Sequence, residues 1–254
     1  MASTIQEWVA QLGSEKPAEA FKAYKQLEET ATRASAPGSE AKCAEVAAEL
    51  AAELNAIKTP ATKNEKGKDV PPQQKHSNTV RGKICRLLAC VAGAKEVPAL
   101  VKAIGELEVR EMARWSLDRN RSEAATDALV KALNEVGTEF RVGVVGSLGK
   151  RKCAMAMAAL QDVANADAEP EVRINAVEVL ANFPEPANAD VILKATQCPC
   201  PLHSTRAWKA AVRLAENLRK AGKKSDAAAL DRKIDSGAPA AQKSAAKIGL
   251  ETTG

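Results

Sequence analysis

The sequence is poor in aromatic residues, which make up only 3% of its 254 residues. The core of a β-sandwich is usually rich in aromatic and β-branched side chains, so this composition argues against that class. Hydrophobic residues nevertheless reach 45% of the chain, and alanine is abundant among them. Because alanine loses no side-chain entropy in a helix, the mixture favours closely packed helices.

Histidine is scarcer still, with only His76 and His203 in the chain. A catalytic triad or a metal centre built on histidine therefore has few members to recruit. The sequence also lacks a Gly-rich phosphate loop, a nucleophile elbow and a His-Glu-x-x-His motif. We therefore predict no catalytic residues, no metal site and no cofactor, and no small-molecule site is evident.

No apolar run is long enough to span a bilayer, and the N-terminal segment lacks the features of a signal peptide. Four of the six cysteines lie within helical apolar patterns, where a reduced cysteine behaves as a small hydrophobic residue. The net charge of +5 is a mild excess, which permits a polyanionic partner without requiring one. We expect a cytoplasmic protein with no membrane association.

What the sequence does contain is a repeated helical pattern. An apolar residue is followed at once by Arg, then by a small or apolar residue four places after the first, and by Leu eight places after it. The pattern occurs at 80–88, 109–117, 140–148 and 172–180, with Arg81, Arg110, Arg141 and Arg173 spaced by 29, 31 and 32 residues. A weaker fifth copy contains Arg206. A second helix is predicted after each copy, so the helix pairs must stack on one another to bury their apolar faces.

The pattern divides the chain into four predicted segments. They are an N-terminal helical cap or degenerate repeat (1–58), a Pro/Lys-rich loop (59–77), five repeats (78–235) and a flexible C-terminal tail (236–254). In the cap, Phe21 and Tyr24 are predicted on the buried face of a helix over 15–34. Two hypotheses remain for 59–77: a surface insertion without fixed structure, or a binding loop folded back over the scaffold.

The repeats resemble HEAT repeats, particularly the short HEAT-like form related to phycobilisome lyase repeats. The segment 169–180, Glu-Pro-Glu-Val-Arg-Ile-Asn-Ala-Val-Glu-Val-Leu, carries the resemblance most fully, and it extends over about 78–235. The resemblance implies an all-α, right-handed α-α superhelix of about 13 helices, with the Arg-bearing helices on the concave side. HEAT-like proteins are mostly protein-binding scaffolds, although some bind DNA, including HEAT-like DNA glycosylases, and some are bilin lyases.

One candidate site lies on the predicted concave face. Its residues are Arg110, Arg114, Trp115, Arg141 and Arg173. The repeated arginines either face an anionic partner or link each repeat to a carbonyl or acidic side chain of the next. Trp115 either fills space between helices or serves as an interface hot spot.

A second candidate site lies in the basic turns after the Arg-bearing helices. Its residues are Arg119, Arg121, Lys150, Arg151 and Lys152. These cations either cap helix ends or form an edge that docks an anionic partner.

A third cluster, Cys198, Cys200 and His203, resembles part of a metal site by residue type. Zinc, however, needs roughly four ligands, usually in paired spacings, and the neighbouring prolines favour a stiff loop.

The leading hypothesis is a non-catalytic scaffold that binds a protein partner through the concave face. The alternative is a nucleic-acid-binding HEAT-like module, of which a DNA glycosylase is one form, that uses the basic edge. A third hypothesis, a lyase-type cofactor chaperone, rests on analogy of fold alone.

Overall fold

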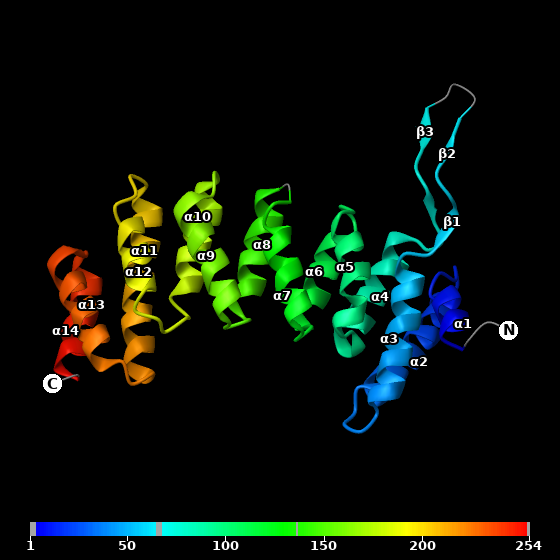
Figure 1. The fold of residues 1–254 in the computed structure, drawn as a ribbon, viewed down its shortest axis with the longest axis horizontal. Helices are drawn as coiled ribbons and strands as arrows, with labels where there is room; N and C mark the ends of the chain where they lie inside the picture. The colour runs from blue at the N-terminus through cyan, green and yellow to red at the C-terminus, as the bar shows by residue number, and fades with distance from the viewer. Residues whose placement is uncertain (1–3, 65–67, 136, 253–254) are drawn as a thin grey trace. The chain divides into compact units, whose positions relative to one another are not determined.

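The computed structural model describes residues 4–64, 68–135 and 137–252. Most of the backbone in these ranges is helical, as Figure 1 shows. The contacts between residues divide the chain into two compact units, 1–129 and 130–254. Across the described ranges, we find no helix that is both long enough and apolar enough to cross a membrane.

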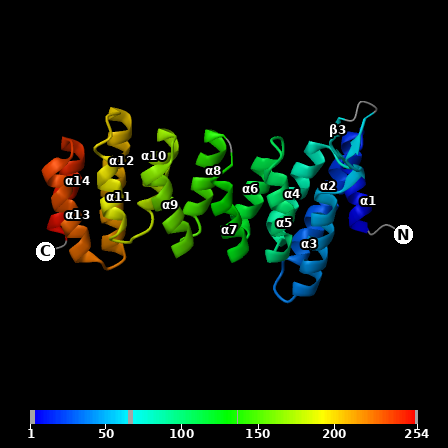
Figure 2. The ribbon, with the colours of Figure 1, turned by 45° about the horizontal axis from the view of Figure 1, so that its top comes forward.

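The first unit consists of two layers of helices. It contains α1 (Thr4–Gln11), α2 (Pro17–Ala34), α3 (Glu40–Leu54), α4 (Asn78–Val91), α5 (Val97–Ile104) and α6 (Arg110–Arg119), with a 3-10 turn, η1 (Ala94–Glu96), before α5. Helices α2, α4 and α6 pack side by side in one layer, while α3 and α5 form a second layer (Figure 2). The Arg-bearing helices α4 and α6 thus share one face with α2.

The second unit repeats the same arrangement. It contains α8 (Thr138–Gly149), α9 (Ala154–Ala166), α10 (Pro170–Leu180), α11 (Asn188–Ala195), α12 (Pro201–Lys220), α13 (Lys224–Gly237) and α14 (Ala240–Glu251), and α7 (Glu123–Ala132) spans the boundary between the units. Here α8, α10 and α12 pack in one layer, and α9 packs on α11 in the other. The helices α4, α6, α8, α10 and α12 alternate along the chain with α5, α7, α9, α11 and α13. The division of 78–235 into five repeats stays a prediction.

The repeated apolar positions form the core of both units. All twelve are buried: Val80, Ile84, Leu88, Val109, Ala113, Leu117, Phe140, Val144, Leu148, Val172, Ala176 and Leu180. In a helix, residues four apart lie on the same face, so the spacing of the pattern aims all three apolar residues of each copy at the neighbouring helices. The pattern that defines the repeats is thus the pattern that packs them.

The segment predicted as a loop over 59–77 contains a β-ribbon. Four short strands, β1 (Ile57–Thr59), β2 (Thr62–Lys63), β3 (Asp69–Val70) and β4 (Gln73–Gln74), pair antiparallel as β1 with β4 and β2 with β3. In Figure 1 the ribbon projects from the helices of the first unit and does not fold back over them. The residues at its turn, 65–67, lie outside the described part of the chain.

Ion pairs hold the base of this ribbon against α3. The buried carboxylate of Glu53 accepts a hydrogen bond from Lys75 Nζ at 2.9 Å and lies 2.6 Å from His76 Nε2. The backbone amide of Lys75 donates to the Ala56 carbonyl at 2.7 Å. Burial raises the pKa of Glu53, but the hydrogen bonds from His76 and Lys75 outweigh it, and the net pKa lies below its usual value.

Three other predictions need correction. The flexible tail predicted for 236–254 is largely helix α14, which packs on α12 and α13. This brings the helices among the described residues to fourteen, where about 13 were predicted. Phe21, predicted on a buried face, is 64% exposed, because nothing in the first unit covers the outer side of α2 at that turn.

Candidate functional site

A groove opens on the layer formed by α2, α4 and α6. It has a volume of about 430 Å³. Its lining residues are Tyr24, Glu28, Ala31, Arg86, Leu87, Cys90, Met112 and Trp115. All of them belong to the first unit, and three neighbouring helices contribute to the groove. We call this surface the aromatic groove.

Two of the few aromatic side chains of the protein, Tyr24 and Trp115, line this groove. Of the seven in the chain, Phe140, Phe183 and Trp208 are buried in the core. Tyr24 and Trp115 are half-buried in the aromatic groove. The exposed ring of Phe21 lies on α2 one turn before Tyr24. Because exposed or half-exposed aromatic residues are few in this Ala-rich chain, the two that line the groove mark this surface.

Trp115 is held in place by its own helix. It lies between the core residues Ala113 and Leu117 of α6, so its side chain leaves the core and reaches the groove. One turn later, the guanidinium of Arg119 lies over its indole ring, 5.1 Å from the ring centroid. Beside it, Arg114 pairs with Glu111 at 2.9 Å. The contact with Arg119 therefore restricts the orientation of the Trp115 ring.

Polar groups at the groove add a specific electrostatic character. Partial burial raises the pKa of Tyr24, and the nearby Glu28 carboxylate adds to the effect. The phenol is therefore neutral across the physiological range and is a hydrogen-bond donor. Glu28 is paired with Lys25 at 2.8 Å, whereas Arg86 makes no ion pair through its guanidinium among the described residues. The unbalanced charge at the groove is thus positive.

The repeated arginines mainly connect elements within each unit. Arg81 is fully buried, and its Nε donates to the Leu54 carbonyl at 2.9 Å while its two terminal nitrogens bind the Glu106 carboxylate. Arg206 binds Glu178 through two nitrogens and also reaches Glu171. These contacts join one helix pair to the next, as expected for the linking interpretation of the pattern.

The other three repeated arginines are half-buried. Arg141 of α8 donates to Asp167 at 2.7 Å, and Arg173 of α10 donates to the backbone carbonyls of Asp167 and Ala168. Arg110 is the first residue of α6. Asp167, in the turn between α9 and α10, therefore contacts arginines of two successive helix pairs and acts as a link in the second unit.

Comparison with known proteins gives likeness of fold but not of sequence. No protein-family model matches the chain, and no curated protein matches it either. Among solved structures, Kap121p, in its complex with RanGTP, aligns over 99% of this chain and 29% of its own, with 13% identity and a TM-score of 0.50. This chain thus spans less than a third of Kap121p. Such identity establishes the fold alone.

Two further structures align over nearly the whole chain. The complex of CpcE and CpcF of phycocyanin lyase from Nostoc sp. PCC7120 covers 100% of it and 96% of the matched chain, at 18% identity and a TM-score of 0.42. The alignment with a designed armadillo repeat protein covers 98% of this chain and 100% of the designed protein, with 17% sequence identity and a TM-score of 0.37.

Two observations decide the fold class. The helices stack in layers around the buried apolar positions of the repeated pattern, and the chain aligns with Kap121p over 99% of its length. The chain is a HEAT-like α-solenoid. The arginine recurs in the repeats of this chain, whereas the residues that line the aromatic groove follow no repeated pattern.

The basic turns of the HEAT-like repeats lie at the ends of α6 and α8. Arg119 and Arg121 are exposed in the first unit. Lys150 to Lys152 follow α8 in the second unit, where Lys152 adopts a positive φ of 48°. Because the two clusters belong to different units, the hypothesis that they form one basic edge for an anionic partner stays a prediction.

The Cys-Pro-Cys segment of the HEAT-like chain forms the turn between α11 and α12. Cys198 is half-buried, Cys200 is exposed, and His203 Nε2 lies 3.3 Å from the Glu171 carboxylate. Within the described ranges, no group of three or more His, Cys, Asp or Glu side chains has the arrangement of a metal site.

Of the residues that line the aromatic groove, only Trp115 was among the candidate site residues predicted from the sequence. Tyr24 was predicted on a core face, and Arg86, Cys90 and Met112 carried no motif. One signal was available: in a chain with seven aromatic residues, Phe21 and Tyr24 lie one turn apart on a polar helix.

Proposed function

We propose that this HEAT-like protein is a non-catalytic cytoplasmic scaffold that binds a protein partner through its layer of Arg-bearing helices. The aromatic groove is the proposed anchor point. The observation that carries the proposal is the composition of this groove, where Tyr24, Arg86, Met112 and Trp115 come together from three helices. Trp, Tyr and Arg dominate interface hot spots, and Met is also enriched in interfaces.

The chemistry of the groove specifies what a partner must present. A large apolar side chain would pack against Trp115 and Met112, where aromatic area is worth most when it is desolvated. A carboxylate beside it would pair with Arg86, since Glu28 is already paired with Lys25. The proposed partner segment therefore carries an apolar residue next to an acidic one. Arg110 and Arg114, on the same helix as Trp115, are the proposed contacts at its border.

The test begins with the purified full chain as bait in a nuclease-treated native lysate. Proteins that it retains are then purified, and their affinity is measured for the wild type, Trp115→Ala and Arg86→Ala. We expect each substitution to weaken binding at least tenfold, because hot-spot residues each contribute at least about 1–2 kcal/mol. Leu107→Ala is the matched control. Leu107 is 66% exposed in the same unit but does not line the groove.

Two results would count against the proposal. Unchanged affinity in both groove variants, with their helical circular dichroism intact, would show that the partner binds elsewhere. If retention is lost on nuclease treatment, falls steeply with salt and depends on Lys150, Arg151 and Lys152, the partner is a nucleic acid and the basic turns are the site.

A further inference from the structure

A second cavity lies entirely within the unit 130–254. Its volume is about 400 Å³, and it lies between α10, α11 and the turn that leads into α12. This volume falls within the range of sites that bind small molecules. No small-molecule site was predicted from the sequence, because the lining residues come from separate helices and form no single motif.

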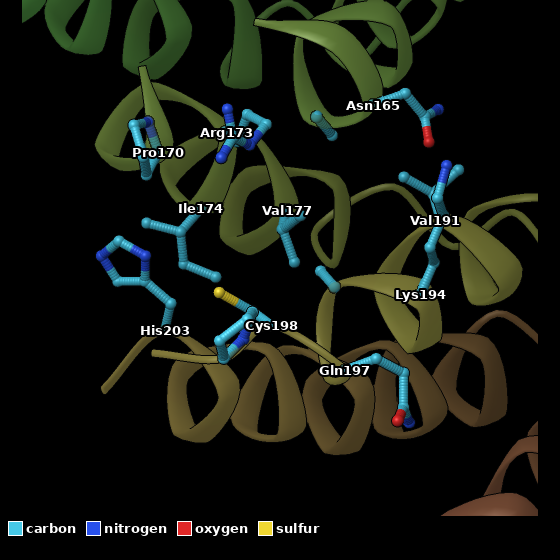
Figure 3. A pocket seen from close by; sticks show the side chains of 13 residues that line it. Asn165, Pro170, Arg173, Ile174, Val177, Val191, Lys194, Gln197, Cys198 and His203 are labelled. Atoms are coloured by element: carbon cyan, nitrogen blue, oxygen red, sulfur yellow. The ribbon is translucent and has the colours of Figure 1, made fainter. Parts of the chain in front are cut away.

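The cavity combines an apolar wall with cationic side chains. Ile174 and Val177 are buried on α10, and Val191 of α11 adds to the apolar lining. Arg173, Lys194 and His203 also line it, and no Asp or Glu does. Figure 3 shows Arg173 and Lys194 on opposite sides of the cavity, with Val177 between them. We call it the Arg173–Lys194 pocket.

The two cations are prepared for a ligand in different ways. Arg173 uses its Nη1 to bind the carbonyls of Asp167 and Ala168, which fixes the guanidinium plane and leaves its Nε and Nη2 for another acceptor. Lys194 makes no ion pair or hydrogen bond through its side chain within the described ranges. His203 Nε2 already lies 3.3 Å from the Glu171 carboxylate, so it is the least available of the three to a ligand.

We propose that the Arg173–Lys194 pocket binds an organic carboxylate with an apolar body. The flat guanidinium matches the geometry of a carboxylate, and Lys194 supplies a second charge from the facing side. The hydrocarbon body would cover Ile174 and Val177, which a small inorganic anion such as phosphate would leave in contact with water. The carboxylate comes either from a free acid or from the C-terminus of a peptide that ends in an apolar residue.

Calorimetric titration of the full chain tests the ligand class directly. The free-acid probes are 4-phenylbutyrate and hexanoate, with hexanamide and inorganic phosphate as controls. A hexapeptide that ends in leucine is compared with the same peptide carrying a C-terminal amide. We expect binding by the carboxylates and at least tenfold weaker binding by the amides and by phosphate. If the free acids bind more tightly than the peptide, the carboxylate comes from a free acid. If the peptide binds more tightly, it comes from a peptide C-terminus.

Variants then locate the binding site. Lys194 is exposed, so Lys194→Gln should fold normally and should weaken the carboxylate at least fivefold, while Lys194→Arg should retain it. Lys209→Gln, an exposed lysine on α12 outside the pocket, is the matched control. Arg173→Gln should have a larger effect, but it also removes bonds to the backbone.

A chemical readout reports occupancy of the pocket independently of calorimetry. Cys198 lines the pocket, and Figure 3 shows its sulfur directed toward Ile174. In a Cys200→Ser background, a bound carboxylate should slow alkylation of Cys198 severalfold without slowing that of Cys90, which is exposed in the other unit. Equal binding of acid and amide, no effect of Lys194→Gln, or no protection of Cys198 would overturn the proposal. These outcomes do not depend on the aromatic groove.

Discussion

Two glycines of α8 show how strongly the surroundings of a single residue decide its role. A Cβ atom at Gly149 would lie 2.3 Å from Cγ1 of Val179 on α10, whereas a Cβ at Gly146 would meet nothing within 4 Å. Val179 is β-branched and has few alternative rotamers. Gly149 thus permits the close approach of α8 and α10, and Gly146 only adds flexibility to the helix.

The two positions predict substitutions of opposite sign. Gly149→Ala should destabilise the protein by about 1–3 kcal/mol, because the new methyl group overpacks the contact with α10. Gly146→Ala should stabilise it by about 0.5–1 kcal/mol, because alanine favours the helix. Urea denaturation of both variants measures the difference. If the two shift the midpoint in the same direction, the close packing of α8 on α10 is not as described.

The sequence predicted residues well where the repeat recurs and poorly where it does not. The spacing of apolar positions placed all twelve frame residues in the core, since a helix of known period fixes which residues share a face. Phe21 was misplaced for a related reason. Periodicity shows which residues share a face of α2, but not how far its neighbours cover that face.

At the scale of elements, the β-ribbon shows what periodicity misses. Its strands are two or three residues long, and nearly all of their side chains are exposed, so they show no alternation of apolar and polar residues. Pro60, Pro71 and Pro72 lie between the strands and not within them, where each would have removed a backbone donor. The prolines correctly excluded a helix but were compatible with strands.

The base of the ribbon gives a pH-dependent prediction. The pKa of Glu53 is lowered in the folded state, so its contribution to stability is present above the unfolded pKa and is lost as the pH falls through the folded value. Glu53→Gln should therefore destabilise the protein by about 1–3 kcal/mol at pH 7. The difference in free energy of unfolding between the variant and the wild type should narrow as the pH falls below about 4.

Denaturation across a pH series measures this gap, and amide hydrogen exchange at 57–59 and 73–75 reports whether the ribbon base loosens. Glu45→Gln, on the same helix, is the control. Glu45 forms an exposed pair with Lys42, and such pairs contribute little. A gap that is constant with pH would show that Glu53 does not act through its charge.

At the scale of the whole molecule, the sequence predicted five repeats but not the element that ends the second unit. Residues 236–254 are rich in alanine, serine, glycine and lysine, a composition typical of a loose tail. The same small residues allow α14 to pack closely on α12 and α13. A Cβ at Gly249 would lie 2.3 Å from Arg219 Nη2 and 2.5 Å from Asp231 Oδ2.

Helix α14 therefore covers a buried ion pair. Arg219 and Asp231 lie 2.6 Å apart, and burial raises the pKa of Asp231 although Arg219 opposes the shift. Helix α14 packs on both α12 and α13. Without it, the small and apolar residues of these two helices that face it would be exposed.

Removal of residues 239–254 tests this role. We expect the truncated chain to lose about 1–3 kcal/mol of stability, because burial of Ala246 and its surroundings is lost, and to bind a dye for exposed apolar surface more strongly. Gly249→Val is the matched point variant, since its side chain would push α14 away from Arg219 and Asp231 without shortening the chain. A loose tail would leave both stability and dye binding unchanged in the two proteins. A packed cap requires both to change in the same direction, because the same contact is removed in one protein and forced apart in the other.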